Sequence, residues 1–512
     1  MGNVVRESLK SSIASYTGLV LGIINVLFLY TKFLTPEELG LTRVLQDSTI
    51  LFVSFAQMGA PFIIIKFFPH FYDTEKKNKG FLFFILVYSF IGFLVFTTLF
   101  LGLQSVILKF YTTNSPLLVQ YFLYIIPLVL GMIYINVLES YALVHNKVFF
   151  PTFVKEVFLK FGNTVVIILF ALNIITFHIL INLLVLFYFL GAGLLTIYIW
   201  KLNALHIRAD FKNFDFSKLR SIIGYGLFTL LGGLGFLLST KIDTVMLPAY
   251  QGLKDTAIYS IAILIATVME IPKRNLTQAI LSHLSFAIKE DDHEKIDELY
   301  KKASLNLFIF GSLIFLIIIA NIDDIFRIIP KGDIYMAGKG VLIILLAGRL
   351  LDMISGINNE IILYSKYYAF SFVLIMILAV CTIIANIILI PIYGIIGAAI
   401  AVTLSGFIYM ILKLFIVWRK FNSHPFKTSM ISSFIIFGIV LLLSIGLNIL
   451  LDKLFPLTDF SVKSKIISAA LVILKSVIIT TIFLLSFIKL KISEDFNNVM
   501  FGLFNKAKSF IK

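Results

Sequence analysis

The sequence predicts an all-α, polytopic membrane protein with about fourteen transmembrane helices, in two six-helix lobes plus two extra C-terminal helices. Three observations predict this. Of the 512 residues, 59% are apolar and 14% are charged, whereas roughly a quarter of the residues in a soluble protein are charged. The apolar residues form runs of about 20 residues or more, the length that a helix needs to cross a bilayer. An internal repeat divides these runs into two sets.

The predicted spans follow from the lengths of the runs. Five runs contain no charged residue: 11–31, 80–108, 221–240, 303–322 and 428–451. Two longer runs, 161–200 and 367–412, are each long enough for two helices, with turns expected at 173–178 and 391–394. Five apolar segments with a few ionisable groups complete the set, near 41–66, 112–142, 255–288, 341–365 and 466–488. We expect their ends to be accurate to several residues only.

Loop charge predicts the orientation. If the N-terminus is cytoplasmic, about 27 of the 43 basic residues lie on the inner side and about nine on the outer side, as the positive-inside rule favours. Both termini are then cytoplasmic, and the first span is a retained helix because no small-residue cleavage site follows it. The net charge of +15 therefore reflects membrane orientation, and we expect no nucleic-acid partner. The tail 491–512 has apolar residues at helical spacing, which predicts an amphipathic helix on the inner leaflet.

The repeat relates the first span to the seventh. Ser12, Ile13, Tyr16, Thr31 and Lys32 recur 209 positions later, without a gap, as Ser221, Ile222, Tyr225, Thr240 and Lys241. The two tryptophans, Trp200 and Trp418, end the sixth and twelfth spans. We therefore expect an N-terminal lobe at 1–200, a cytoplasmic linker at 201–220, a C-terminal lobe at 221–420 and helices 13 and 14 within 421–490. Such repeats are common in transporters, with the substrate site between the lobes near mid-membrane.

Three local motifs resemble those of a known family. They are Thr35-Pro36-Glu37-Glu38-Leu39-Gly40, the stretch 240–247 with 256–262, and the stretch 386–399 around Pro391-Ile392-Tyr393-Gly394. Together with the length and the span count, they resemble the bacterial polysaccharide-biosynthesis flippases (O-antigen or repeat-unit exporters) of the multidrug/oligosaccharidyl-lipid/polysaccharide transporter superfamily. Drug exporters and peptidoglycan-precursor flippases share this architecture. Lys241 departs from the pattern, which more often has an acidic or neutral residue there.

The resemblance implies what the protein does. A V-shaped cavity between two bundles would hold an undecaprenyl-diphosphate-linked oligosaccharide by basic side chains and carry it from the inner to the outer leaflet by alternating access. It also implies the bacterial inner membrane, contact with membrane lipids and contact with the polysaccharide polymerase machinery.

Charged residues within the spans are the candidate site, because a charge at mid-membrane costs about 2.5–3.5 kcal/mol even on the lenient scale. The substrate-binding candidates are Arg43, Lys241, Lys273, Arg274 and Arg349. The candidates for ion coupling are Asp47, Asp243 and Glu270. Structural pairing on one helix face is the alternative for Arg43 with Asp47, Glu270 with Arg274, and Arg349 with Asp352. Glu139, Lys413 and Lys475 are expected to snorkel or to pack between helices.

The eighth span carries the sharpest signal. Glu270, Lys273 and Arg274 share one face beside Pro272, which interrupts the helix. One acid cannot neutralise two bases, so a lipid diphosphate is the expected partner of the surplus positive charge.

Catalysis is not expected. The sequence has no glycine-rich phosphate loop and no His/Cys metal spacing, so we expect neither an enzyme nor a cofactor. The rival interpretation is a cation-coupled multidrug or organic-cation antiporter on the same fold, which would use acids such as Asp47 and Glu270. A non-transporting scaffold is disfavoured by the charges within the membrane.

Overall fold

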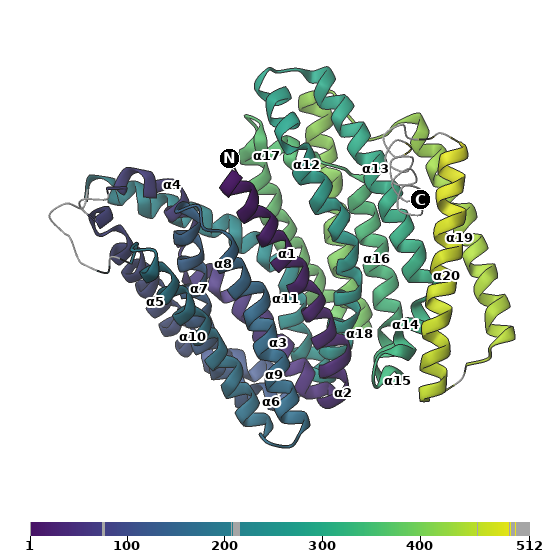
Figure 1. Cartoon of the computed structure of the whole chain (residues 1–512), viewed down its shortest axis with the longest axis horizontal. Coiled ribbons are helices and arrows are strands. Elements are labelled where there is room, and N and C mark those ends of the chain that lie inside the picture. Colours follow the sequence, from purple (N-terminus) through teal and green to yellow (C-terminus); the bar gives the residue numbers. More distant parts are fainter. Residues whose placement is uncertain are drawn as a thin grey trace. The chain divides into compact units, whose positions relative to one another are not determined.

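The computed structural model describes residues 2–73, 77–205, 207, 216–457, 459–490, 492 and 497 (Figure 1). In these residues every regular element is a helix, and no strand is present. Ten helices among them are long and apolar enough to cross a membrane, or eleven if a bent pair counts as one span. The prediction of an all-α, polytopic membrane protein is therefore confirmed. Most of the predicted tail 491–512 and much of the linker 201–220 lie outside the described residues.

The chain divides into two compact units, which are described separately. The first comprises residues 1–260 and 386–395, and the second comprises 261–385 and 396–512. The predicted lobe boundaries at 200 and 221 do not coincide with this division, because residues 221–260 cluster with the N-terminal helices. The assignment of lobes to 1–200 and 221–420 stays a prediction.

The first unit begins with a broken helix: α1 (Gly2–Ile24), the π-helix η1 (Asn25–Tyr30) and α2 (Thr31–Phe33). Next come α3 (Pro36–Ala56) and α4 (Ala60–Phe71), bent by 41°, then η2 (Lys77–Gly80) and α5 (Phe81–Tyr111). The remaining helices up to the linker are α6 (Pro116–Tyr121), η3 (Phe122–Tyr124), α7 (Ile125–Val144), α8 (Phe149–Thr152), the π-helix η4 (Phe153–Phe158), α9 (Leu159–Ala171) and α10 (Phe177–Lys201).

The motif at 35–40 has a physical explanation. Thr35 caps α3: its hydroxyl accepts a hydrogen bond from the Glu38 N–H at 3.2 Å, and the Glu38 carboxylate accepts one from the Thr35 N–H at 2.8 Å. This capping box satisfies two amides that the helix cannot. Gly40 lets α3 approach a later segment, since a Cβ there would lie 2.0 Å from the Leu253 carbonyl oxygen. The motif therefore starts one helix and packs it tightly against another.

Two long helices each contain a break. Helix α11 (Leu219–Ala266) follows η5 (Phe216–Lys218) and loses helical geometry at Gly252 (φ 84°), and α18 (Tyr368–Phe421) does so at Gly394 (φ 58°). At about 1.5 Å per residue, each is roughly twice as long as one crossing requires. The predicted turn at 391–394 is confirmed. The seventh span, expected at 221–240, instead continues to Gly252.

The second unit contains the other helices. After the end of α11 come η6 (Thr267–Met269), α12 (Glu270–Lys289), α13 (His293–Ala320), α14 (Ile322–Ile328), α15 (Gly332–Tyr335) and η7 (Met336–Gly338). They are followed by α16 (Lys339–Ile354), α17 (Asn358–Tyr364), most of α18, α19 (Thr428–Leu454) and α20 (Val462–Lys489). Helix α18 is long enough for two crossings, and the predicted eighth span comprises the end of α11 after Gly252, η6 and α12.

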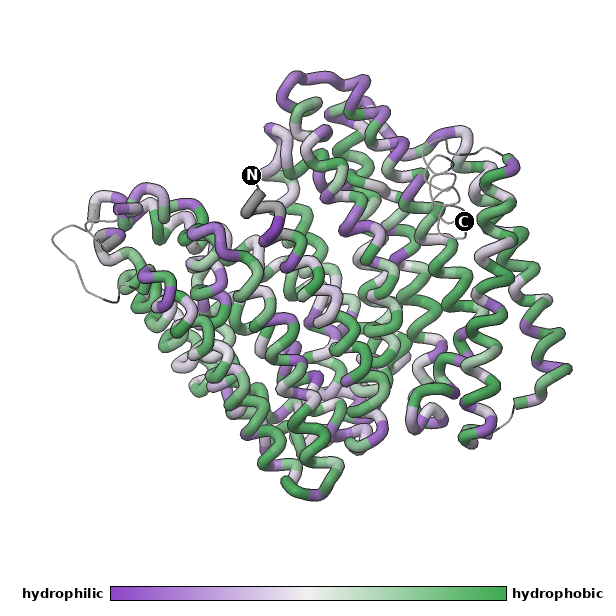
Figure 2. The backbone as a smooth tube through the Cα atoms, viewed as in Figure 1, coloured by the Kyte–Doolittle hydropathy of each residue, from purple (hydrophilic) through white to green (hydrophobic). Residues whose placement is uncertain are grey.

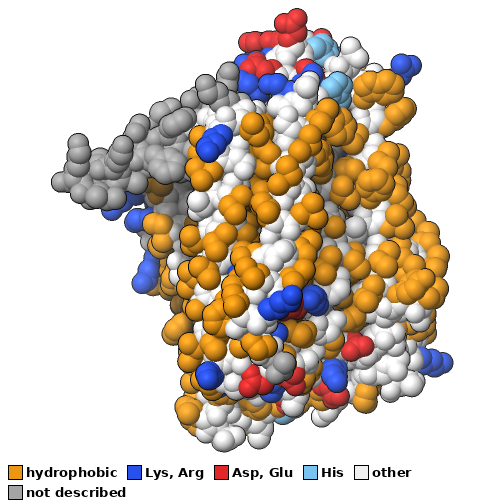
Figure 3. Space-filling model, turned by 90° about the vertical axis from the view of Figure 1, so that its right-hand side faces the viewer, with side chains coloured by type: hydrophobic (Ala, Val, Ile, Leu, Met, Phe, Trp, Pro, Cys, Tyr) orange, Lys and Arg blue, Asp and Glu red, His pale blue; other side chains and the backbone are white. Residues whose placement is uncertain are grey.

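Apolar side chains cover the outside of the helices. Figure 2 shows hydrophobic residues along most of each long helix and hydrophilic residues mainly near the helix ends. The face drawn in Figure 3 is covered mostly by hydrophobic side chains. On α19 and α20, Leu442 is 70% and Ile473 68% exposed. A surface of this kind suits lipid, because in water a contiguous apolar patch of this extent is rare.

Candidate functional site

The eighth-span residues lie at the start of α12. The 3₁₀ turn η6 separates α12 from α11, and Glu270, Pro272, Lys273 and Arg274 form its first turns. Proline is tolerated there because its missing N–H has no partner within the first turn of a helix. The expected interruption is thus a junction between two helices, which places three charged side chains close to the break.

Two ion pairs join α12 to α16. Lys273 Nζ lies 2.5 Å from Asp352 Oδ2, and Arg349 Nη1 lies 2.6 Å from Glu270 Oε1. The sequence left open a pairing within one helix face, of Glu270 with Arg274 and of Arg349 with Asp352. The structure shows pairing between the two helices instead. Each base bonds a carboxylate on the other helix, Lys273 from α12 to α16 and Arg349 from α16 to α12.

These pairs are accessible. The side chains of Lys273 and Asp352 are 21% and 41% exposed, and those of Arg349 and Glu270 are 36% and 38% exposed. Arg274 is exposed, and in the described part of the chain no ion pair or hydrogen bond holds it. Three bases therefore face two acids, and Arg274 carries the surplus positive charge.

Two lysines that were expected to snorkel or to pack between helices are buried. Lys413 on α18 is 3% exposed, with Nζ 4.2 Å from the centroid of the Tyr409 ring. Lys475 on α20 is also 3% exposed, and its Nζ lies 2.7 Å from Asp324 Oδ2 on α14. Of the two alternatives, packing between helices is the one observed, because neither ammonium reaches the surface. The third such residue, Glu139, pairs with Lys155 of η4 at 2.7 Å.

A second charged cluster lies in the first unit, on α3 and α11. Asp47 is 4% exposed and pairs with Lys241 Nζ at 2.7 Å. Arg43 donates to Gln46 Oε1 at 3.3 Å, so the pairing of Arg43 with Asp47 that the sequence left open as an alternative is not formed. Because α11 continues to Gly252, Lys241 lies inside the helix and reaches the carboxylate of α3.

Asp243 is held without a cation. It is 3% exposed, accepts a short hydrogen bond from the Tyr259 hydroxyl and accepts another from the Thr244 N–H at 2.9 Å. Asp47 and Lys241 neutralise each other, so this cluster offers no free positive charge from Lys241. Among the described residues, no base contacts Asp243 directly.

The α11 break is stabilised by polar side chains. Tyr111 donates to the Val245 carbonyl at 2.9 Å, Ser115 to the Pro248 carbonyl at 2.7 Å and Asn114 to the Ala249 carbonyl at 2.8 Å. Proline and glycine leave backbone groups unsatisfied in a membrane helix, and neighbouring side chains must satisfy them. Residues 245–249 are therefore hydrogen-bonded to α5 and to the turn after α5.

Lys66 was missed by the sequence analysis. It lies on α4, is exposed and places Nζ 3.8 Å from the centroid of the Tyr225 ring. The sequence feature that could have identified it is a single lysine in the apolar segment 60–71, at the edge of the predicted second span.

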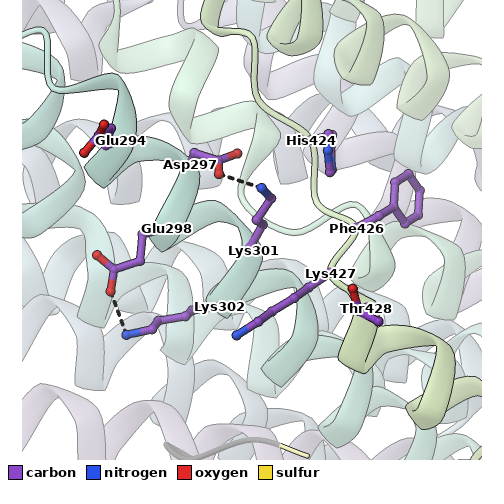
Figure 4. Close-up of a pocket in the computed structure, with 9 residues that line it drawn as sticks. All are labelled: Glu294, Asp297, Glu298, Lys301, Lys302, His424, Phe426, Lys427 and Thr428. Carbon is purple, nitrogen blue, oxygen red and sulfur yellow. Dashed lines mark hydrogen bonds and ion pairs between the residues drawn. The ribbon is translucent and has the colours of Figure 1, made fainter.

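A polar cavity of about 490 Å³ lies between the start of α13 and the segment 424–428 (Figure 4). Two of its three acids are paired: Lys301 bonds Asp297 at 2.6 Å and Lys302 bonds Glu298 at 2.7 Å, while Glu294 also lines the cavity. Figure 4 shows Lys427 pointing toward Lys302. The cavity contains none of the predicted site residues, so the cluster of α12 and α16 remains the candidate site.

Comparisons with known proteins agree with this architecture. The structure resembles that of the lipid II flippase MurJ in an inward closed conformation, with a TM-score of 0.69, 18% identity, and 92% of this chain and 98% of that chain covered. It also resembles an inward-facing multidrug resistance transporter of the MATE family, in the MOP superfamily, with a TM-score of 0.61, 14% identity, and 81% and 98% covered. At these identities the likeness concerns the fold. No curated protein matches the sequence significantly. A family model described as polysaccharide biosynthesis protein matches residues 4–271, more than half of the chain, and the protein therefore belongs to the polysaccharide biosynthesis protein family.

Proposed function

We propose that this protein is a flippase that carries an undecaprenyl-diphosphate-linked oligosaccharide, such as an O-antigen or another polysaccharide repeat unit, from the inner to the outer leaflet of the bacterial cytoplasmic membrane. Membership of the polysaccharide biosynthesis family and the likeness to a lipid II flippase support a lipid-linked substrate. Both termini would be cytoplasmic, and the polysaccharide polymerase machinery would receive the product.

The observation that carries the proposal is Arg274 beside Lys273, because no described residue pairs with Arg274. A diphosphate accepts charge-assisted hydrogen bonds from both kinds of base. Arg274 is free to donate at once, whereas Lys273 would exchange Asp352 for a phosphate oxygen. Because the paired side chains are partly exposed, an incoming headgroup can reach them.

The rival, a cation antiporter, has less support from the contacts. Two of the acids it would use are already paired, Asp47 with Lys241 and Glu270 with Arg349. Asp243 remains as a candidate for ion coupling, because its described partners are a hydroxyl and an amide. Proton or cation coupling through Asp243 is compatible with either transport function.

The membrane potential would assist export. A diphosphate carries roughly two negative charges, and each is worth about 2.3 kcal/mol per 100 mV when it moves toward a positive exterior. Flipping measured in vesicles should therefore speed up when the receiving side is made positive. An unchanged rate would argue against net movement of an anion.

The decisive experiment replaces both bases. The double variant Lys273→Gln, Arg274→Gln should lose surface polysaccharide at normal protein levels, because a charge pair at 4 Å is worth about 4 kcal/mol at an effective dielectric of 20. Lys339→Gln is the control, since Lys339 pairs with Asp323 at a site where both side chains are 41% exposed. Full export by the double variant contradicts the proposal. Loss of function in Glu270→Gln together with drug sensitivity supports the antiporter.

A further inference from the structure

Lys413 is an unusual buried charge. It lies on the second half of α18, 3% exposed, with its ammonium over the Tyr409 ring at 4.2 Å. In the described residues no carboxylate bonds it. A buried ammonium without a carboxylate is strongly unfavourable, and an aromatic face offsets only part of that. Lys475, which is also buried, is neutralised by a direct ion pair with Asp324.

Two carboxylates lie within electrostatic reach of Lys413 without bonding it. Asp352 is held by Lys273 at 2.5 Å. Glu360, on α17, has a buried Oε2 atom for which the described residues supply no hydrogen-bond donor. Helix α18, which carries Lys413, contacts α16, which carries Asp352, because the Thr403 hydroxyl donates to the Ile344 carbonyl at 3.4 Å. Asp352 already has a base, and that base is one of the two proposed to bind the substrate.

We propose that Lys413 is a reserve counter-charge, which takes over Asp352 when an anionic headgroup takes Lys273. This inference rests on the proposed function. A phosphate bound to Lys273 displaces Asp352, and an unpaired carboxylate within the membrane is costly. If Lys413 pairs with Asp352, substrate binding replaces the Lys273–Asp352 ion pair by a Lys413–Asp352 ion pair. No carboxylate is then left without a partner. Lys413 is thus a positioning residue, which acts on the substrate through Asp352.

The arrangement explains why the cluster keeps an acid next to a substrate-binding lysine. In the empty protein, Asp352 neutralises Lys273, and in the loaded protein it would neutralise Lys413. The Tyr409 hydroxyl, which donates to Asn359 Oδ1 at 3.2 Å, fixes the ring on which the ammonium rests. A purely structural lysine would have no such dependence on Asp352.

A double-mutant cycle tests this dependence. Binding of a polyprenyl diphosphate to the full chain in lipid nanodiscs is measured for the wild type, Lys413→Met, Asp352→Asn and the double variant. Lys413→Met should weaken binding about tenfold or more, because Asp352 then stays on Lys273. Lys413→Arg should restore most of the affinity. The double variant should bind as tightly as Asp352→Asn alone, since no acid remains to compete.

The outcomes separate the two proposals. Equal affinity of the wild type and Lys413→Met overturns the role of Lys413 but leaves the flippase proposal standing. A double variant as weak as Lys413→Met also overturns it, because a structural defect would not be rescued by Asp352→Asn. Absence of binding by the wild type overturns the proposed function and this inference with it. If Lys413→Met does not fold, Lys413→Gln takes its place in the same cycle.

Discussion

Two adjacent aspartates on α14 allow a sharp test of what burial does to an ion pair. Asp324 and its partner Lys475 are 2% and 4% exposed in their side chains, whereas Asp323 and Lys339 are both 41% exposed. The bonds have the same length, 2.7 Å. The variants Asp324→Asn and Asp323→Asn are therefore the same substitution at adjacent positions; the two sites differ in burial, and Asp324 also contacts Ser468 and Arg327.

The expected loss of stability in each variant follows from this difference in burial. Removing one partner of a buried pair costs about 3–5 kcal/mol, because the other charge stays buried without a partner. An exposed pair contributes about 0–1 kcal/mol. Asp324→Asn should therefore lower thermal stability far more than Asp323→Asn. Lys475→Met should cost less than Asp324→Asn, since Asp324 retains Ser468 at 2.9 Å and Arg327 at 3.4 Å.

The assay is thermal unfolding of the purified chain in detergent, followed by the loss of the monodisperse peak. The expected order of midpoints is wild type and Asp323→Asn highest, then Lys475→Met, then Asp324→Asn. The double variant Asp324→Leu, Lys475→Met should regain stability, because well-packed apolar residues can replace a buried pair. Equal midpoints for Asp323→Asn and Asp324→Asn would refute the reasoning.

Three further predictions concern the first unit and the topology. Asp47→Lys combined with Lys241→Asp should restore function that either single variant loses, as measured by surface polysaccharide; failure of the exchange would show that the pair at 2.7 Å is not what these residues contribute. Gly40→Ala should destabilise the chain, since its Cβ would lie 2.0 Å from the Leu253 carbonyl oxygen, while Gly224→Ala, with nothing within 4 Å, serves as control in the same unfolding assay. After Cys381 is replaced, a cysteine at position 212 should resist a membrane-impermeant reagent in intact cells and one at position 114 should react; efficient labelling at 212 would reverse the predicted orientation.

The sequence predicted what depends on local chemistry. The run lengths predicted a polytopic all-α chain, the Thr35 motif proved to be a helix cap, and the turn at 391–394 proved to be a break at Gly394. It did not predict the ion pairs, because their partners come from different helices. Lys475 and Asp324 are 151 positions apart, and Lys273 and Asp352 are 79 apart. A rule for charges four positions apart on one helix cannot predict ion pairs between residues of different helices.

Exposure divides the intramembrane ion pairs into two kinds with different consequences. The Lys475–Asp324 pair is closed: at 4% and 2% exposure no ligand can enter, and separation would leave two buried charges. The Lys273–Asp352 and Arg349–Glu270 pairs are open, with every side chain more than a fifth exposed. An open pair can exchange its partner for a substrate group at little electrostatic cost, provided that the displaced charge finds another partner. Among the described charges of the second unit, Arg274 has no partner, and we propose that Lys413 receives the displaced carboxylate. The open pairs and these two bases therefore form the part of the cluster suited to an anion.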